Sequence, residues 1–219
     1  TQTTEVARPR AVLVGVQFHD VTDLEHQGSL DELAQLVKTL GYDVVGRVSQ
    51  KRKAIDGGVV LGEGKLAELA TWTGGTGIVD TRTPKKPQKK DLRPPTFDDD
   101  EDESAEDVVV EHARADVVVI DHELSPMQFK NVASATGAEV LDRAGVIVEI
   151  FHRHASSPEA RLQVELARLK YVAPRLRASG GGFDRQGGGV GAKGAGESQL
   201  ELDRRKIRDR VAEIKAELV

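Results

Sequence analysis

The residues best suited to chemistry form a glycine-rich segment near the carboxyl end of the sequence. It runs from Gly180 to Gly196, and glycine, which lacks a Cβ, lets the backbone adopt positive φ and approach a partner closely. Exposed N–H groups there and in the first turn of a following helix are able to cradle phosphate. Phe183 would stack on an unpaired base. Flanking cations are Arg175, Arg177, Arg185, Lys193, Arg204, Arg205, Lys206, Arg208 and Arg210. The pattern predicts a narrow basic finger that enters a crevice of folded RNA.

Other interpretations of the glycine segments start from the same residues. A flexible linker between two helices has a similar glycine content, and the flanking arginines argue against it but leave it open. Gly189, Gly191 and Gly194 match the G-x-G-x-x-G dinucleotide fingerprint, but no predicted strand precedes them. The segment Leu61–Lys65 resembles a phosphate loop, yet positions 59 and 66 hold valine and leucine where a Walker A motif needs glycine and Ser or Thr.

Two clusters of acidic and histidine residues follow predicted strands. One comprises His19, Asp20 and Asp23, and the other is Asp121–Glu123. Open α/β sheets bind ligands at such strand ends. Neighbouring residues of an extended chain point in opposite directions, however, so neither cluster converges on one ion. We therefore predict no metal site and no catalytic residue, and we expect Ser125 to cap the next helix.

The composition indicates a soluble cytoplasmic protein without a membrane anchor. The 219 residues carry a formal net charge of −5, and none is cysteine, which excludes disulfides and zinc–thiolate sites. No apolar run approaches the roughly 20 residues that cross a bilayer.

Residues 152–219 hold 14 Lys and Arg against 9 Asp and Glu, although the whole chain has 31 against 36. A basic segment in an acidic protein is typical of polyanion binding. There, His152 and His154 flank Arg153 on a predicted extended segment, which favours a surface or RNA contact over a zinc site.

The elements that must position these groups belong to two regions. Residues 11–151 alternate between strand-like and helix-like patterns, which predicts an α/β fold with a mostly parallel sheet flanked by helices. Strands are expected at 11–18, 43–49, 59–61, 116–121, 139–141 and 146–151, and helices at 29–41 (Ser29 as N-cap), 65–71 and 126–134. Residues 81–107 interrupt this pattern with Lys-Pro repeats and six consecutive acids, and we interpret them as a disordered charged insertion.

Residues 156–219 predict a long antiparallel helical hairpin whose tip loop is 180–196. Ser157 and Pro158 begin the first helix, and the second starts near Glu197. Pro174 is expected to kink or loosen the end of the first helix. Roughly 20 helical residues would place the loop about 30 Å from the hairpin base, away from the sheet. Apolar residues at heptad spacing form the seam: Leu162, Leu166, Leu169, Ala173 and Leu176 on the first helix, and Leu200, Ile207, Val211, Ile214 and Leu218 on the second.

Several motifs together resemble the HflX family of translation-associated GTPases. The stretch from Gly188 to Arg205 reads Gly-Gly-Val-Gly-Ala-Lys-Gly-Ala-Gly-Glu-Ser-Gln-Leu-Glu-Leu-Asp-Arg-Arg and is similar to the family signature G-G-x-G-x-[RK]-G-P-G-E-[ST]-Q-L-E-x-D-R-R. Further matches, in the family's order, are Gly62–Lys65, Asp121–Pro126, Leu141–Gly145 and Leu162–Ala167.

The resemblance implies the N-terminal region of a GTPase that binds the large ribosomal subunit and helps to separate stalled or idle 70S ribosomes in a stress response. Its glycine loop would lie near the peptidyl-transferase centre, in contact with 23S rRNA. Nucleotide binding by this region, ATP in particular, would involve Gly62, Gly64 and Lys65. The resemblance carries over Gly187 to Glu197 as rRNA-facing, with Arg177, Arg185 and Lys193 as electrostatic partners. Together with the aromatic and cationic residues above, the predicted RNA-binding residues are Arg177, Phe183, Arg185, Gly187, Gly188, Gly189, Gly191, Lys193, Gly194, Gly196, Arg204 and Arg205.

The sequence departs from the family pattern in two places. Ala195 replaces the usual proline, which implies a less rigid loop, and the insertion 81–107 has no counterpart in the usual pattern. No G-x-x-x-x-G-K-[ST] motif occurs, so we expect no cofactor in these residues and no GTP hydrolysis by the family's mechanism. GTP and Mg²⁺ would belong to a C-terminal G domain outside this chain. The open alternatives are an independent ATP-binding α/β domain and a hairpin that binds protein.

Overall fold

The computed structural model describes residues 8–55, 57–79, 114–179 and 199–218, with the side chains of 177–179 and 199–200 left out. Among these residues, four parallel strands form one sheet in the order β2-β1-β3-β4. The strands are β1 (Arg10–Phe18), β2 (Asp43–Arg52), β3 (Val117–Ile120) and β4 (Glu139–Asp142). β1 and β3 are central and nearly continuous in buried apolar residues, as expected for strands covered on both faces. The predicted α/β fold is confirmed.

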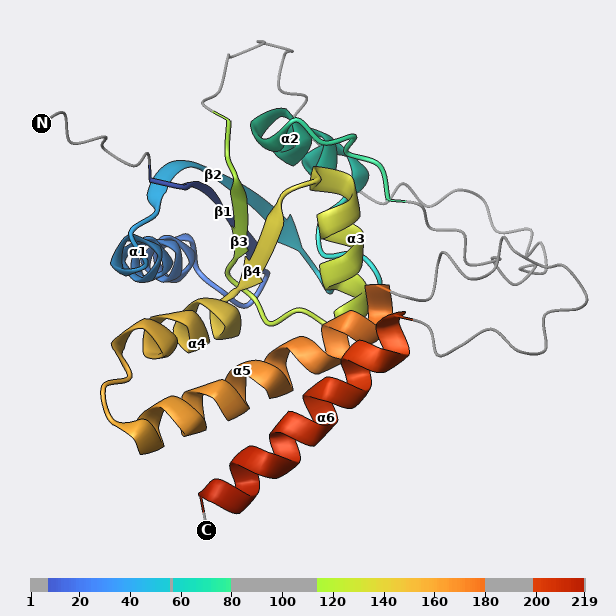
Figure 1. The fold of residues 1–219 in the computed structure, drawn as a ribbon. Coiled ribbons are helices and arrows are strands. Elements are labelled where there is room, and N and C mark those ends of the chain that lie inside the picture. Colours follow the sequence, from blue (N-terminus) through green and yellow to red (C-terminus); the bar gives the residue numbers. More distant parts are fainter. Residues whose placement is uncertain (1–7, 56, 80–113, 180–198, 219) are drawn as a thin grey trace, which may run out of the picture.

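Two helices cover each face of the sheet (Figure 1). On one face, α1 (Asp23–Thr39) and α4 (Arg143–His154) enclose a core that includes Leu30, Leu33 and Val146. On the other face, α2 (Glu63–Thr73) and α3 (Pro126–Thr136) enclose a second core around β1, β3 and β4. The chain crosses β1 between β2 and β3, so the carboxyl ends of β1 and β3 form the topological switch point.

The predicted hairpin is confirmed as α5 (Pro158–Ser179) and α6 (Gln199–Glu217), which lie antiparallel (Figure 1). Ser157 starts α5, as predicted, because its hydroxyl accepts from the N–H of Ala160 at 3.1 Å. The helix continues past Pro174 to Ser179. α6 packs on α5, and Ile214 of its predicted seam is fully buried.

The position of the hairpin differs from the prediction that it extends away from the sheet. α5 packs along α3 and α4 and lies beneath the α/β layers in Figure 1. Arg175, one turn before the end of α5, reaches Asp142 at the end of β4 with an Nη2–Oδ2 distance of 2.6 Å. The end of α5 that leads into the glycine-rich segment is therefore attached to the α/β layers.

The predicted strand at 146–151 is wrong, because these residues lie in helix α4. Asp142 caps this helix by accepting the N–H of Gly145 at 2.8 Å. Val146 is fully buried and Ile150 packs beside it, whereas Phe151 is 60% exposed. This burial follows helical spacing, so the cap and the one-sided core outweigh the strand preference of β-branched residues.

Two other predicted boundaries need correction. Helix α1 begins at Asp23 rather than after Ser29, because Thr22 and Glu25 form a reciprocal capping box. The earlier start buries His26 and leaves Ser29 inside the helix. Residues 59–61 form no strand, although Val60 and Leu61 are buried. They are fixed by irregular contacts instead, including an N–H···O bond from the Arg52 guanidinium to the Val60 carbonyl.

Candidate nucleic-acid interface and the junction that positions it

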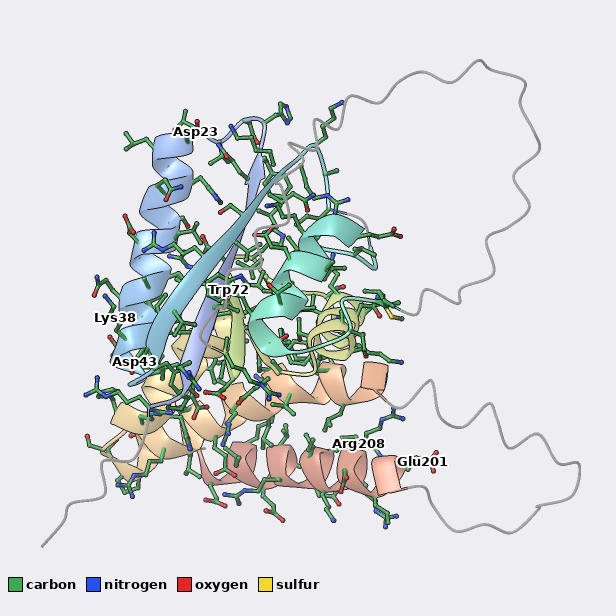
Figure 2. The ribbon with its side chains drawn as sticks, turned by 90° about the horizontal axis from the view of Figure 1, so that it is seen from above. Asp23, Lys38, Asp43, Trp72, Glu201 and Arg208 are labelled. Atoms are coloured by element: carbon green, nitrogen blue, oxygen red, sulfur yellow. The ribbon has the colours of Figure 1, made fainter. Side chains whose placement is uncertain are left out.

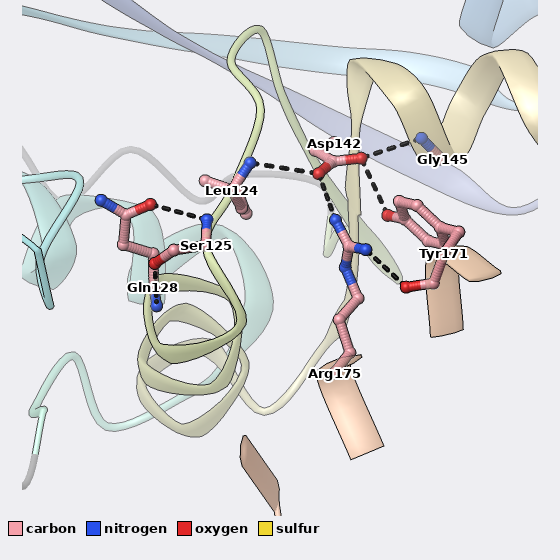
Figure 3. Close-up of polar contacts among 7 residues, drawn as sticks. All are labelled: Leu124, Ser125, Gln128, Asp142, Gly145, Tyr171 and Arg175. Carbon is pink, nitrogen blue, oxygen red and sulfur yellow. Dashed lines mark hydrogen bonds and ion pairs between the residues drawn. The ribbon is translucent and has the colours of Figure 1, made fainter. Parts of the chain in front are cut away.

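One buried carboxylate, that of Asp142, lies where the hairpin meets the α/β layers (Figure 3). Its side chain is fully buried, and its two oxygens accept four hydrogen bonds from three neighbouring elements. Oδ1 accepts from the Gly145 N–H and the Tyr171 hydroxyl, both at 2.8 Å. Oδ2 accepts from the Leu124 N–H at 3.1 Å and from Arg175 at 2.6 Å. Asp142 thus connects the β3–α3 loop, α4 and α5. We call this set of five residues the junction.

The α5 side of the junction is matched to this carboxylate in charge and shape. The guanidinium of Arg175 lies 3.5 Å from the centre of the Tyr171 ring and 5.3 Å from that of Phe129. Burial and the negative charge of Asp142 raise the pKa of Tyr171, so its phenol stays protonated and donates to the carboxylate. A Cβ on Gly145 would lie 2.7 Å from Cζ of Tyr171, so only glycine leaves room for the ring.

A second arginine, Arg143, lies beside the switch point of the sheet and bonds to residues of the elements around it. Arg143, in the first turn of α4, donates to Asp121 at 2.9 Å and to Ser29 at 3.2 Å, and pairs with Glu32 at 2.6 Å. These bonds, that to Glu32 first, raise the pKa of Arg143. The side chain of Asp121 is only 7% exposed. The Asp121–Arg143 pair therefore joins the end of β3 to α4, where a ligand of an open sheet would enter.

The two clusters of acidic and histidine residues are spread over separate contacts. Asp23 accepts from Gln17 at 2.7 Å and pairs with Lys51 at 3.0 Å, which together lower its pKa. His122 packs edge-on against Phe18. Within the described ranges, no group of three His, Asp or Glu residues is arranged to hold a metal ion. Ser125 caps α3 in a capping box with Gln128, as predicted.

The glycines proposed for nucleotide binding lie at the start of α2. Gly62 is the N-cap residue, and its N–H donates to Oε1 of Gln50 at 2.8 Å. Lys65 turns along its own helix and pairs with Glu68 at 2.6 Å, while Gly64 is exposed. The backbone and side-chain donors that would meet a phosphate at Gly62 and Lys65 are thus engaged within the chain. ATP binding there stays a prediction.

Most of the predicted RNA-facing residues lie outside the described residues. These are Phe183, Arg185, Gly187, Gly188, Gly189, Gly191, Lys193, Gly194 and Gly196. Arg177 is described as part of α5 without its side chain. Arg204 and Arg205 lie in the first half of α6, where Arg205 is exposed and Arg204 half-buried, and both also interact within the chain.

Two cations that the sequence offered for RNA contact are engaged within the chain: Arg175 of the flanking set, and Arg153 between His152 and His154. Arg175 is only 12% exposed and serves the junction, so it is not available to RNA. Arg153 donates to the Leu40 carbonyl and lies 5.7 Å from the centre of the Tyr42 ring, so it joins α4 to the end of α1. His154 accordingly lies in a helix, where Nδ1 contacts the Ile150 carbonyl at 2.8 Å, and not on the predicted extended face.

On one flank of the hairpin, the cations are neutralised by neighbouring carboxylates. Arg210 of α6 binds both carboxylate oxygens of Glu165 on α5, at 2.7 and 2.9 Å. It also approaches Glu213 at 3.2 Å and Glu217 at 3.6 Å. This flank is unsuited to phosphate, because one guanidinium is shared by three carboxylates.

The sequence did not predict the junction, although three of its five residues lie in the family motifs described above. Leu141–Gly145 and Asp121–Pro126 match motifs of the family, and within them the sequence predicts only the helix cap at Ser125. The structure confirms that cap and gives a physical reason for Asp142 and Gly145. The available signal was Asp142 itself, an N-cap residue directly before a segment that begins Arg-Ala-Gly.

Comparison with known proteins shows the family to which the chain belongs. A family model of the GTP-binding GTPase N-terminal region matches residues 27–81 and 102–152, and one of the GTP-binding GTPase middle region matches 154–219. The curated protein "GTPase HflX" of Gluconacetobacter diazotrophicus is 57% identical over 96% of this chain and 46% of its own length. "GTPase HflX" of Escherichia coli is 34% identical over 97% of this chain and 40% of its own length. The chain belongs to the HflX family and corresponds to its N-terminal region.

The chain spans less than half the length of these curated relatives. Among solved structures, a GTP-binding protein from the archaeon Sulfolobus solfataricus in complex with GDP aligns with a TM-score of 0.53 at 20% identity. That alignment covers 95% of this chain and 44% of the archaeal one. Similarity at this level supports the fold alone. No helix among the described residues is both long and apolar enough to cross a bilayer.

Proposed function

We propose that this chain is the ribosome-binding region of a longer HflX GTPase, and that its hairpin presents the glycine-rich segment to 23S rRNA of the large subunit. In that longer protein, GTP and Mg²⁺ would bind a separate G domain. Its GTP cycle would drive the separation of 70S ribosomes in the cytoplasm, including under stress. The proposal rests on family membership and on the basic charge of residues 152–219.

The structural observation that supports the proposal, beside family membership and charge, is the junction. Arg175 and Tyr171 fix the last turns of α5 to the sheet, so the chain enters the glycine-rich segment from a defined point. Ordering a binding segment before it meets its partner lowers the entropy cost of association. A linker between two helices would not need a buried ion pair at its point of departure.

The experiment is co-sedimentation of this chain with isolated large and small ribosomal subunits over a range of salt concentrations. We expect binding to the large subunit that weakens steeply with salt, because each phosphate contact releases counterions. The double variant Arg185→Ala, Lys193→Ala should weaken binding by about tenfold or more, equal to about 1.4 kcal/mol. The matched control is Lys38→Ala, Lys53→Ala, which removes the same charge from exposed positions on the α/β region. Equal binding by both double variants, or binding insensitive to salt, would refute the proposed contact.

A further inference from the structure

An apolar groove lies between α5 and α6 on the flank of the hairpin opposite the Glu165–Arg210 pair. Its cavity volume is about 290 Å³. Lys170 lies well over 100° around the α5 axis from Glu165, and Arg208 lies well over 100° around the α6 axis from Arg210. Helical periodicity therefore places both cations on this flank. Its lining is otherwise aliphatic or proline: Leu169, Ala173, Pro174, Ile207 and Val211.

Two cations, Lys170 and Arg208, line the edge of this groove. Lys170 and Arg208 are both exposed, and neither has an ion pair or hydrogen bond with any residue that the structure describes. Figure 2 labels Arg208 on α6, away from Lys38 on α1. On the opposite flank, Arg210 is held by carboxylates. An apolar floor between two available cations suits a ligand that combines a flat apolar face with negative charge.

We propose that this groove binds an unpaired nucleotide of RNA, with the base against the aliphatic floor and the adjoining phosphates at Lys170 and Arg208. Flipped bases are held between aromatic or apolar side chains, and arginine planes also stack on bases. The inference rests on the proposed function and extends it from the glycine-rich segment to the helices, with an unpaired nucleotide as the ligand.

The dimensions of the groove favour a nucleotide over a peptide helix. Its α5 wall runs from Leu169 to Pro174, about 8 Å at the helical rise of 1.5 Å per residue. A bound amphipathic helix uses anchors from i to i+7, which span about 10 Å. The volume of about 290 Å³ is also just below the range of roughly 300–1,000 Å³ for small-molecule pockets. The groove therefore matches one planar group and its charged neighbours.

The position of the groove connects it with the glycine-rich segment. Pro174 lies about 8 Å along α5 from Ser179, where the helix ends, and Ile207 lies about 12 Å from Gln199, where α6 begins. The helix ends that flank the glycine-rich segment therefore lie about 8 and 12 Å from the groove, measured along the helix axes.

The test uses the complete 219-residue chain and three fluorescent probes in anisotropy titrations. The probes are a single-stranded decauridine, an abasic strand with the same number of phosphates, and an acidic amphipathic peptide. We expect decauridine to bind about tenfold more tightly than the abasic strand, within the range measured for stacking of one base on a protein. Lys170→Gln, Arg208→Gln should weaken decauridine binding by about tenfold, whereas Lys38→Gln should leave it unchanged.

A second variant tests the floor of the groove. Ala173→Met fills the groove and should weaken decauridine binding to the level of the abasic strand. Ala216→Met, at an exposed position of α6, is the control for the same substitution. Thermal unfolding of both variants checks that the hairpin is intact.

Three results would overturn the groove proposal. They are equal binding of decauridine and the abasic strand, unchanged binding by the groove variants, and groove-dependent binding of the acidic peptide without decauridine, which would indicate a protein partner. Failure of the groove is distinguishable from failure of the proposed function. If the groove alone fails, Arg185→Ala, Lys193→Ala still weakens co-sedimentation with the large subunit by about tenfold or more.

Discussion

Two arginine–carboxylate pairs hold the hairpin in place. One attaches α5 to the end of β4, and the other joins α6 to α5. The pairs differ in solvent exposure rather than in the distance between nitrogen and oxygen. Arg175 and Asp142 lie 2.6 Å apart with side chains 12% and 0% exposed. Arg210 and Glu165 lie 2.7 Å apart with side chains 39% and 37% exposed. An exposed pair contributes about 0.2–1 kcal/mol, whereas breaking a buried pair costs about 3–5 kcal/mol. Burial therefore decides which contact fixes the hairpin.

The largest expected effect comes from removal of the buried carboxylate. Asp142→Ala leaves Arg175 without its buried partner and the N–H groups of Leu124 and Gly145 without acceptors, so the free energy of unfolding should fall by about 3–5 kcal/mol. Urea denaturation measures the change, and Asp142→Asn serves as the isosteric variant if the alanine protein fails to fold. Glu165→Ala, the matched removal from the exposed pair, should cost less than about 1 kcal/mol. Equal losses in the two proteins would contradict the comparison.

A smaller effect is expected from a single added methyl group. Gly145→Ala forces the Tyr171 ring away from the carboxylate, and overpacking of this kind costs about 1–3 kcal/mol. Gly28→Ala provides a control of opposite sign, because a Cβ at this exposed position inside α1 meets nothing within 4 Å. Alanine should stabilise α1 by up to about 1 kcal/mol. A loss at both positions in thermal unfolding would argue against a specific clash in the junction.

The hydroxyl of Tyr171 tests the polar part of the junction without changing its shape. Tyr171→Phe should lower the free energy of unfolding by about 1.5 kcal/mol, because Asp142 loses a buried donor. The folded-state pKa of Tyr171 is raised above 10.0, so this stability is fully present below pH 10.0 and is lost as the pH rises through the higher value. The measurement is the difference in free energy of unfolding between the wild-type protein and the variant, at pH 7 and at pH 11. A difference that grows with pH would contradict the role of the Tyr171 hydroxyl as a donor to Asp142.

The smallest effect is expected from the exposed pair. Arg210→Gln should lower the free energy of unfolding less than Asp142→Ala, Gly145→Ala or Tyr171→Phe, because solvent screens an exposed pair. The hydrogen bond from Arg210 lowers the pKa of Glu165 below 4.5, so its contribution is present above pH 4.5 and is lost as the pH falls through the folded value. NMR titration of the Glu165 carboxylate should show a higher pKa in the variant. An unchanged pKa would indicate that the pair does not persist in solution.

Most of the fold could be predicted because the strongest sequence signals are local. The apolar run that forms β1, the glycine after α1 and the Ser125–Pro126 start of α3 each act within a few residues of themselves. The predictions failed where two local patterns competed. Thr22 and Ser29 both precede a glutamate at the capping-box spacing, and only the burial of His26 distinguishes them.

The position of a cation in the sequence does not show which way its side chain points in the fold. Arg175 and Arg208 both belong to the basic carboxyl-terminal segment. The structure turns the first toward Asp142, 33 positions earlier in the chain, and leaves the second exposed beside an apolar groove. A side chain that carries charge is buried only where a partner compensates it, and that partner lies on another element.

The sequence by itself determined the alternation of strands and helices, the seamed hairpin, the basic glycine-rich segment and the family. Each of these depends on periodicity, composition or a contiguous motif. Tertiary structure alone decided that Val146–Phe151 is helical, that Gly145 must lack a Cβ and that the hairpin packs against α3 and α4. Those outcomes depend on contacts between residues far apart in sequence, whose energies exist only after the elements have packed together.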